Sequence, residues 1–193
     1  MIKFRDTLRF SALALICLGV MTVQVPAADD SGGMTVSPTP SPGDTAIGFS
    51  LPDQHNDMHS LKDYLGRWVV LYFYPKDMTP GCTKEACSFR DSYKAFKDMD
   101  VVILGVSRDS VDLHEKFSEK YNLPFTLLSD AGGTVCGAYG VLAEKSYNGK
   151  TYLGIHRTTF IIDPKGKIAK IYPDVDVNTH AEEILNDIHK LRE

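Results

Sequence analysis

The sequence has few cysteines, and none of them forms a Cys-x-x-Cys pair. Its 193 residues include four cysteines: Cys17 lies in an apolar N-terminal segment, and Cys82, Cys87 and Cys136 lie further along the chain. If the N-terminal segment is removed, the count becomes odd, whereas a purely structural disulfide framework uses cysteines in pairs. A zinc knuckle would use the closer Cys-x-x-Cys spacing. Neither kind of site accounts for these cysteines.

The sequence also has no stretch dominated by positive charge. Its 21 lysines and arginines are dispersed among 25 acidic residues, and the formal net charge is −4. A protein that binds a phosphate backbone needs a basic stripe or patch. We therefore expect no nucleic-acid partner. No internal repeat is visible either, so a repeat architecture is not expected.

The apolar run at the N-terminus is too short to span a bilayer comfortably, because a spanning helix needs about 20 residues. This run occupies residues 10–21, follows three basic residues and is followed by a Val-Pro-Ala sequence that ends at Ala27. The arrangement is typical of a secretory signal. We predict a signal peptide over residues 1–27 and an exported, periplasmic protein without stable membrane insertion after cleavage; an uncleaved N-terminal anchor is the alternative. Lipid attachment at Cys17 is not favoured, because Ile16 stands where a small residue is needed.

The segment after the predicted signal differs in composition from the rest of the chain. Residues 29–44 are rich in serine, glycine and proline and show no apolar period, which predicts a flexible tether over residues 28–43. The whole sequence is 43% hydrophobic and 24% charged, as is usual for a globular protein. We predict one folded domain over residues 44–193.

The apolar pattern of this domain alternates between strands and helices. Continuous apolar and β-branched runs predict buried strands, and the last run is split by a turn at residues 163–166 into a hairpin; these runs are residues 68–75, 101–109, 125–130 and 158–173. Apolar residues at helical spacing predict three helices, over residues 80–99, 110–121 and 178–192. This order favours an α/β protein with a thioredoxin-like fold, in which a central mixed β-sheet is flanked by helices on both faces. Trp68 is expected to pack in the core.

The sequence Thr-Pro-Gly-Cys places a cysteine at the start of the first predicted helix. Thr79 suits the N-cap position, Pro80 suits the first helical position, and Cys82 then falls in the first turn. The free amide groups and the helix dipole at this end favour a thiolate, which is the nucleophilic form. Gly81 removes bulk from the approach to the sulfur. The alternative is that Cys82 is an unreactive small core residue.

The second cysteine follows at a spacing that does not suit a disulfide within an intact helix. Residues five apart on a helix have Cα atoms about 8 to 9 Å apart, whereas a disulfide needs less than about 7 Å. Cys82 and Cys87 can therefore join only if the first turns unwind. Cys87, in the second turn, lacks the helix terminus and should stay protonated. A reactive thiolate that has a second thiol nearby is typical of chemistry that passes through a sulfenic acid, because the second thiol can condense with that acid. Reaction with peroxide produces such a sulfenic acid.

The residues around these cysteines resemble the active-site segment of the peroxiredoxins, specifically the bacterioferritin-comigratory or Q-type thiol peroxidases. The pattern Pro-x-x-x-Thr-x-x-Cys is met by Pro75, Thr79 and Cys82, and the optional resolving cysteine of that group is met by Cys87. Further segments also resemble the family, so that the likeness covers about residues 43–193.

The resemblance implies a role for each site residue. Cys82 is the expected peroxidatic cysteine, which attacks the peroxide; Thr79 and the Cys82 backbone N–H would bind the peroxide oxygens beside Gly81. Arg157 would polarise thiolate and peroxide, although from the residues alone a surface ion pair is the stronger interpretation of this arginine. Pro75 would shield the pocket from water.

The resemblance also implies the reaction as a whole. Hydrogen peroxide and organic hydroperoxides would be reduced to water and alcohols, with Cys87 resolving the sulfenic acid as a Cys82–Cys87 disulfide. A thioredoxin or thioredoxin-like donor would reduce this disulfide, with no bound cofactor and no metal. The expected oligomeric state is a monomer.

Two other functions suit the fold less well. A thiol–disulfide oxidoreductase normally has Cys-x-x-Cys at the helix start, and a copper chaperone on this fold would have Cys-x-x-x-Cys with a distant histidine; the chain has neither spacing.

Four further residues leave alternatives open. Glu85 either bonds to Arg157 or the backbone, or is an exposed helix acid. Cys136 is a buried small residue rather than a second resolving thiol. His55 and His59 have the spacing of a metal pair, but the residues between them indicate a hairpin turn instead.

Overall fold

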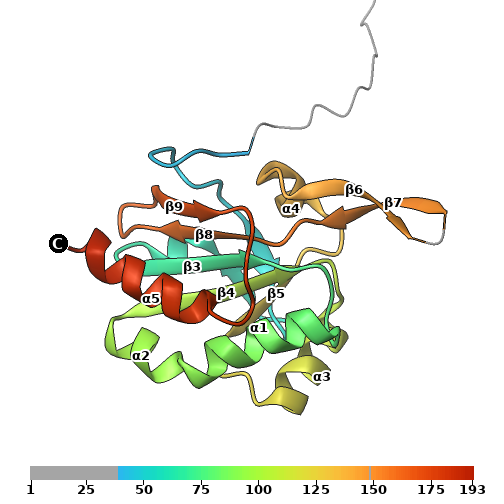
Figure 1. Ribbon diagram of the computed structural model, residues 1–193, viewed down its shortest axis with the longest axis horizontal. Helices are drawn as coiled ribbons and strands as arrows, with labels where there is room; N and C mark the ends of the chain where they lie inside the picture. The colour runs from blue at the N-terminus through green and yellow to red at the C-terminus, as the bar shows by residue number, and fades with distance from the viewer. Residues whose placement is uncertain (1–38, 148) are drawn as a thin grey trace, which may run out of the picture. The chain divides into compact units, whose positions relative to one another are not determined.

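The computed structural model describes residues 39–147 and 149–193 (Figure 1). The predicted signal peptide, and the predicted tether as far as residue 38, lie outside these residues. The last residues of the predicted tether contact the domain: the Gly43 N–H donates to the Ile168 carbonyl at 2.7 Å, and Thr39 Oγ1 lies 3.5 Å from the Gly140 carbonyl. The hydrogen-bonded structure therefore begins a few residues before residue 44.

A five-stranded mixed sheet forms the centre of the domain, in the order β5-β4-β3-β8-β9. β3 runs parallel to β4 and β4 runs parallel to β5, whereas β8 is antiparallel to both β3 and β9. The strands are β3 (Trp68–Phe73), β4 (Val101–Ser107), β5 (Thr126–Ser129), β8 (Thr158–Ile162) and β9 (Ile168–Tyr172). The predicted mixed sheet and its late hairpin are confirmed.

The middle strand, β3, is apolar on both sides because both faces of the sheet are covered. Val70 and Tyr72 belong to one buried cluster, and Leu71 and Phe73 belong to the other. Successive strand residues point to opposite faces, so an uninterrupted apolar run is what a doubly covered strand requires. Trp68, at the exposed end of β3, packs against the first cluster.

The longer helices gather on one face of the sheet, as Figure 1 shows for α1, α2 and α5. These helices are α1 (Pro80–Asp91), α2 (Tyr93–Asp98), α3 (Val111–Tyr121) and α5 (His180–Leu191). The other face is covered by N-terminal residues, including the 3-10 helix η1 (Leu61–Tyr64), and by the short helix α4 (Thr134–Ala138). Helices thus lie on both faces, as predicted, but unequally.

Two details of the predicted helices are wrong. The helix expected over residues 80–99 is two helices, because the chain turns at Ser92 (φ −93°, ψ 1°), whose N–H still donates to the Ser88 carbonyl. On α3 the expected apolar residue Leu113 is 41% exposed, and His114 occupies the buried position beside it. The helical period predicted the buried face of α3 to within one residue, but it could not show that a histidine is part of that face.

Two small hairpins have strands that were not predicted from the sequence. β1 (Ser50–Pro52) pairs with β2 (Met58–Ser60), and β6 (Leu142–Tyr147) pairs with β7 (Lys150–Ile155) in a hairpin that projects to the right in Figure 1. The first pair is only three residues long on each side, and the second carries mostly polar side chains. The turn expected between His55 and His59 is present, with Asn56 at a positive φ of 67°.

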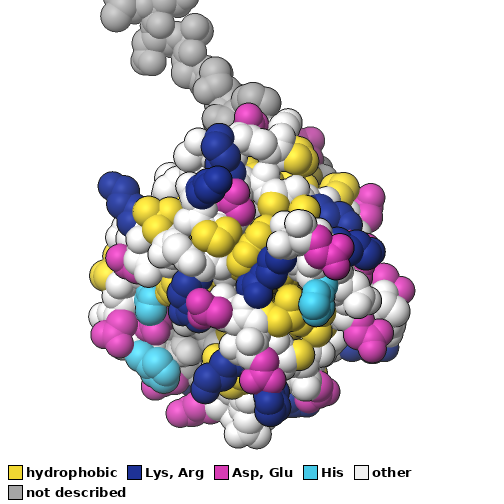
Figure 2. Space-filling view, turned by 90° about the vertical axis from the view of Figure 1, so that its left-hand side faces the viewer, with side chains coloured by type: hydrophobic (Ala, Val, Ile, Leu, Met, Phe, Trp, Pro, Cys, Tyr) yellow, Lys and Arg dark blue, Asp and Glu magenta, His cyan; other side chains and the backbone are white. Residues whose placement is uncertain are grey.

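The surface agrees with the absence of a basic stripe from the sequence. On the face seen in Figure 2, Lys and Arg side chains alternate with Asp and Glu. Across residues 39–147 and 149–193, no helix is both long and apolar enough to cross a bilayer.

Candidate active site

Cys82 lies at the start of α1, the helix that follows the C-terminal end of β3 in the chain. Thr79 is the N-cap residue with extended backbone (φ −80°, ψ 149°), Pro80 opens the helix, and the Cys82 side chain is buried, with only 3% of the residue exposed. The Thr79 hydroxyl makes no capping bond to the helix. Instead Oγ1 donates to the Lys76 carbonyl at 2.9 Å, so the predicted N-cap position is confirmed but its capping bond is absent.

Arg157 brings a positive charge to the sulfur from the segment between β7 and β8. Its Nη2 donates to Cys82 Sγ at 3.2 Å, and its Nη1 pairs with Glu85 Oε2. Burial opposes the guanidinium charge, but Glu85 and Cys82 outweigh that effect and hold the pKa of Arg157 above its ordinary value. The surface-pair interpretation of this arginine is therefore wrong, because its partners are buried side chains on α1.

Glu85 completes this group from one turn further along α1. It is 1% exposed, so the alternative of an exposed helix acid is wrong and the bond to Arg157 is confirmed. Burial raises the pKa of Glu85 to about 7, although Arg157 acts in the opposite direction. Its Oε1 is buried without a hydrogen-bond partner in the described part of the chain. The carboxyl group can therefore exist in either protonation state near neutral pH.

Gly81 and Pro75 frame the approach to Cys82. A Cβ at Gly81 would stand 3.5 Å from Arg157 Nη2, in ordinary van der Waals contact with it, so the glycine leaves open a space beside the guanidinium that a side chain would occupy. Pro75 is exposed at the start of the loop that leads to α1. The shielding of the site by Pro75 stays a prediction.

Cys87 lies five positions along the same intact helix. Its thiol is free and half-buried, in a shallow surface groove formed by Lys84, Cys87, Ser88, Asp91, Ser92, Val177, Asn178 and Glu182. Cys82 is also free. The described structure is therefore the state with a folded helix and two separate thiols that the spacing predicted.

Cys136 lies on the other face of the sheet from Cys82. It is fully buried among the residues of the opposite cluster, and its N–H donates to Asp130 Oδ2 at 2.7 Å. Burial, together with the nearby Asp130 carboxylate, raises the pKa of the Cys136 thiol well above its ordinary value. This environment agrees with the buried small residue and not with a second resolving thiol.

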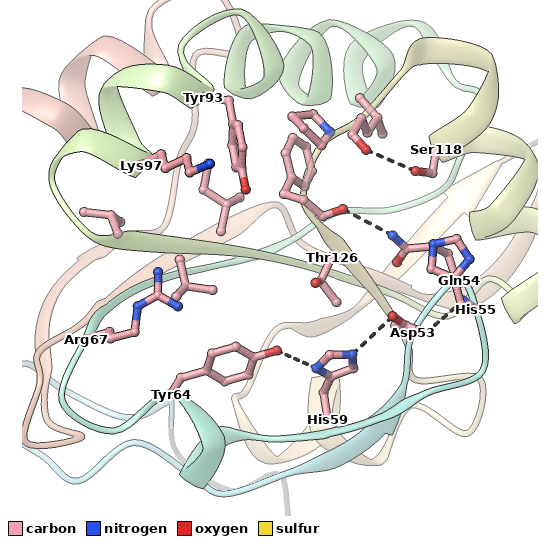
Figure 3. Close-up of a pocket in the computed structure, with 16 residues that line it drawn as sticks. Asp53, Gln54, His55, His59, Tyr64, Arg67, Tyr93, Lys97, Ser118 and Thr126 are labelled. Carbon is pink, nitrogen blue, oxygen red and sulfur yellow. Dashed lines mark hydrogen bonds and ion pairs between the residues drawn. The ribbon is translucent and has the colours of Figure 1, made fainter.

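His59, one of the two histidines with metal-pair spacing, makes a hydrogen-bond contact through each of its ring nitrogens. Figure 3 shows His59 between Asp53 and Tyr64, with Nε2 3.1 Å from Asp53 Oδ2 and Nδ1 2.6 Å from the tyrosine hydroxyl. Both ring nitrogens are therefore already used. Backbone N–H groups and His59 outweigh the effect of burial and lower the pKa of Asp53. Within the described residues no cluster of three or more potential metal ligands occurs.

These residues border a cavity of about 590 Å³ between α2, the β1–β2 turn and the first residues of β4. Cys82 is not among the residues that line it. The cavity is therefore separate from the candidate active site.

Sequence reasoning missed several buried polar side chains near Cys82. The Tyr72 hydroxyl is buried without a hydrogen-bond partner, and the ring lies so close to Gly105 that a Cβ there would come within 2.6 Å of it. His180 is 1% exposed, and burial, reinforced by Arg157, lowers its pKa to about 4. Asp77 and His114 are buried together. The sequence signal that could have indicated these side chains is the presence of polar or small residues within otherwise apolar patterns.

Comparison with known proteins places this arrangement in a family. Residues 42–171 match the model of the AhpC/TSA family. The chain belongs to this family. It is 53% identical over 143 residues to a putative peroxiredoxin bcp of Coxiella burnetii, covering 74% of this chain and 95% of that protein, and 47% identical over 151 residues to peroxiredoxin Bcp of Bacillus subtilis, covering 78% and 96%. The chain is therefore a peroxiredoxin, a thiol peroxidase that reduces peroxides.

Solved structures of peroxiredoxins agree with the fold. Mycobacterium tuberculosis peroxidoxin BcpB superposes with a TM-score of 0.71 at 40% identity, covering 79% of this chain and 98% of that one. A bacterioferritin comigratory protein of Xanthomonas campestris, described for its alkyl peroxide reduction activity, gives 0.71 at 38% identity, with coverage of 75% and 92%. The thioredoxin-like fold expected from the sequence is confirmed.

Proposed function

We propose that Cys82 is the peroxidatic residue of this peroxiredoxin. The main support is the 3.2 Å contact between Arg157 Nη2 and Cys82 Sγ at the N-terminus of α1, because the cation and the helix terminus both favour a thiolate. The sulfur attacks the terminal peroxide oxygen, a sulfur–oxygen bond forms and the oxygen–oxygen bond breaks. Sulfur is oxidised to a sulfenic acid, and the other peroxide oxygen takes a proton and leaves as water or an alcohol.

The direction of the Thr79 hydrogen bond suggests how the peroxide is held. Because the hydroxyl proton is directed to the Lys76 carbonyl, Oγ1 presents its lone pairs and can accept a hydrogen bond from the peroxide O–H. The Cys82 N–H lies among the first N–H groups of the helix, which have no intrahelical partner, and it can donate to the peroxide. Arg157 then stabilises the charge that develops on the departing oxygen.

Cys87 resolves the sulfenic acid in this mechanism. Its thiol attacks the Cys82 sulfur, a disulfide forms and water leaves. A dithiol donor of the thioredoxin type then reduces the disulfide. Support comes from the half-buried position of Cys87 in a surface groove, which a donor can approach more easily than the buried Cys82.

We further propose that the mature protein is exported and acts as a monomer without a bound cofactor. The support for export is the basic and apolar pattern of residues 1–27. In an oxidising compartment the Cys82–Cys87 disulfide would persist unless electrons were delivered across the membrane. Cell fractionation, with the N-terminus of the mature chain determined by mass spectrometry, tests both cleavage and location.

Replacing the resolving cysteine tests the division of roles. Cys87→Ser is expected to leave the first oxidation of Cys82 near its normal rate but to lower multiple turnover with a thioredoxin donor, because the sulfenic acid loses its partner and over-oxidises to sulfinic acid. Mass spectrometry after one equivalent of peroxide should detect the sulfenic form. Normal cycling of this variant would show that another thiol resolves it.

Oxidation is expected to loosen the opening turns of α1. Because an intact helix holds Cys82 and Cys87 too far apart for a disulfide, bond formation must release amide groups that the dithiol form protects. Hydrogen exchange should therefore become faster over residues 80–90 in the disulfide form, with little change in β3 and β4. Equal protection in both forms, with the disulfide confirmed by peptide mapping, would contradict this mechanism.

A further inference from the structure

Beneath the loop that connects β3 to α1 lies a buried pair of side chains that the mechanism above does not use. Asp77 belongs to this loop and is 4% exposed, and His114 on α3 is fully buried. Asp77 Oδ2 lies 2.8 Å from His114 Nδ1, and its Oδ1 accepts a hydrogen bond from the Tyr74 hydroxyl at 2.7 Å. Both carboxylate oxygens are therefore engaged inside the protein.

The hydrogen-bond partners determine how many protons this pair holds. His114 Nε2 lies 3.2 Å from the Leu128 carbonyl, which can only accept, so Nε2 carries a proton. The 2.8 Å contact with Asp77 then requires one more proton between Nδ1 and Oδ2. Whichever atom holds it, the pair has no net charge. Removing one partner would leave a buried polar group unpaired, which is costly.

The loop is tied to the sheet at a second point. The Asp77 N–H donates to Asp109 Oδ2 at 2.8 Å, and the same carboxylate accepts from the Ser107 hydroxyl at 2.7 Å. The Asp109 carbonyl accepts from the Ser129 hydroxyl at 2.6 Å. The backbone of Asp77 is thereby connected to the ends of β4 and β5, whereas its side chain is connected to α3.

The same short loop orients the hydroxyl that meets the peroxide. Thr79 Oγ1 donates to the carbonyl of Lys76, the residue directly before Asp77, and Met78 directly after it has a left-handed backbone with φ 59°. A residue other than glycine rarely adopts this conformation. The loop geometry is therefore imposed by its contacts, and Asp77 provides three of them.

We propose that Asp77 and His114 are positioning residues for peroxide reduction: by holding the Lys76–Met78 backbone, they place the Thr79 hydroxyl against the peroxide beside Cys82. This inference rests on the proposed function of Cys82 and Thr79. Reduction of the disulfide starts from an unwound helix and involves no peroxide, so the effect of the pair falls on the oxidation of Cys82 and not on that step.

Measuring the two half-reactions separately tests this role. Stopped-flow oxidation of the reduced full-length protein by hydrogen peroxide should be slowed at least about tenfold in His114→Leu and in Asp77→Ala, because displacement of a reacting group by about 1 Å is enough for such a loss. Reduction of the disulfide by dithiothreitol should stay within about twofold of wild type, since that step starts from the unwound helix. Glu115→Gln, an exposed neighbour of His114, is the matched control and should leave both rates unchanged.

A conservative variant separates positioning from charge. In Asp77→Asn the amide can donate to His114 Nδ1 and its oxygen can still accept from Tyr74, so every partner of the network remains bonded. Its oxidation rate should stay within about threefold of wild type, well above the tenfold loss expected from removal of a partner.

The outcomes distinguish this inference from the function on which it rests. Asp77→Ala removes the carboxylate itself, and the Tyr74 hydroxyl, 3.3 Å from His114 Nδ1, can donate to the freed nitrogen, so this variant provides a folded test even if His114→Leu fails to fold; unfolding is followed by circular dichroism. A folded Asp77→Ala protein oxidised at the wild-type rate would overturn the positioning role. Equal losses in both half-reactions would also overturn it. A wild-type protein that does not react with peroxide would instead contradict the proposed function.

Discussion

Cys82→Ser is expected to abolish peroxide consumption. Serine in this position has no accessible anion at neutral pH, and neither the helix terminus nor Arg157 can turn its hydroxyl into a comparable nucleophile. The substitution preserves size at a buried site where Arg157 Nη2 lies 3.2 Å from the side-chain atom, so the fold should be retained. Peroxide remaining after incubation with the protein and a dithiol donor measures the loss.

Cys136 offers a matched control for this prediction. It is also buried and free, but it lies in the cluster on the opposite face of the sheet. Cys136→Ala should therefore keep turnover close to wild type. The proposal would be wrong if Cys82→Ser retained more than a few per cent of turnover, or if Cys136→Ala lost as much turnover as Cys82→Ser, because Cys82 would then not be the only reacting cysteine.

The central sheet could be predicted because its strands are buried on both faces. Runs such as residues 68–73 are apolar without interruption, and this pattern is hard to confuse with a surface element. The β6–β7 hairpin lacks this signal, since most of its described side chains are at least partly exposed. The break between α1 and α2 at Ser92 also has no glycine or proline to indicate it. Apolar period continues across this turn, so the pattern predicted one helix.

The active site could be predicted only where its residues are neighbours in the sequence. Thr79 and Cys82 follow from local helix signals, whereas Arg157 lies 75 positions from Cys82 and came from the resemblance alone. The pairing of Asp77 with His114, 37 positions apart, could not be seen at all. A pattern of residue types shows which elements form, but contacts between elements depend on how the chain brings them together.

Arg157→Met is expected to slow the reaction of Cys82 with peroxide by at least about a hundredfold, the scale of losing one preorganised electrostatic donor. Methionine keeps much of the side-chain volume but removes both the bond to Cys82 Sγ and the ion pair with Glu85. The protein should still fold, because burial already raises the pKa of Glu85 to about 7. Without the opposing guanidinium this pKa rises further, and the carboxyl group becomes neutral instead of remaining an unpaired charge.

A rate measurement checks this expectation. Stopped-flow oxidation under single-turnover conditions gives the rate at which Cys82 reacts with peroxide. Arg108→Met is the matched control, since Arg108 is exposed and its guanidinium donates to the Leu153 carbonyl; the rate of this variant should not change. An Arg157→Met rate within about threefold of wild type, far from the loss expected of an electrostatic donor, would mean that the guanidinium serves only to neutralise Glu85.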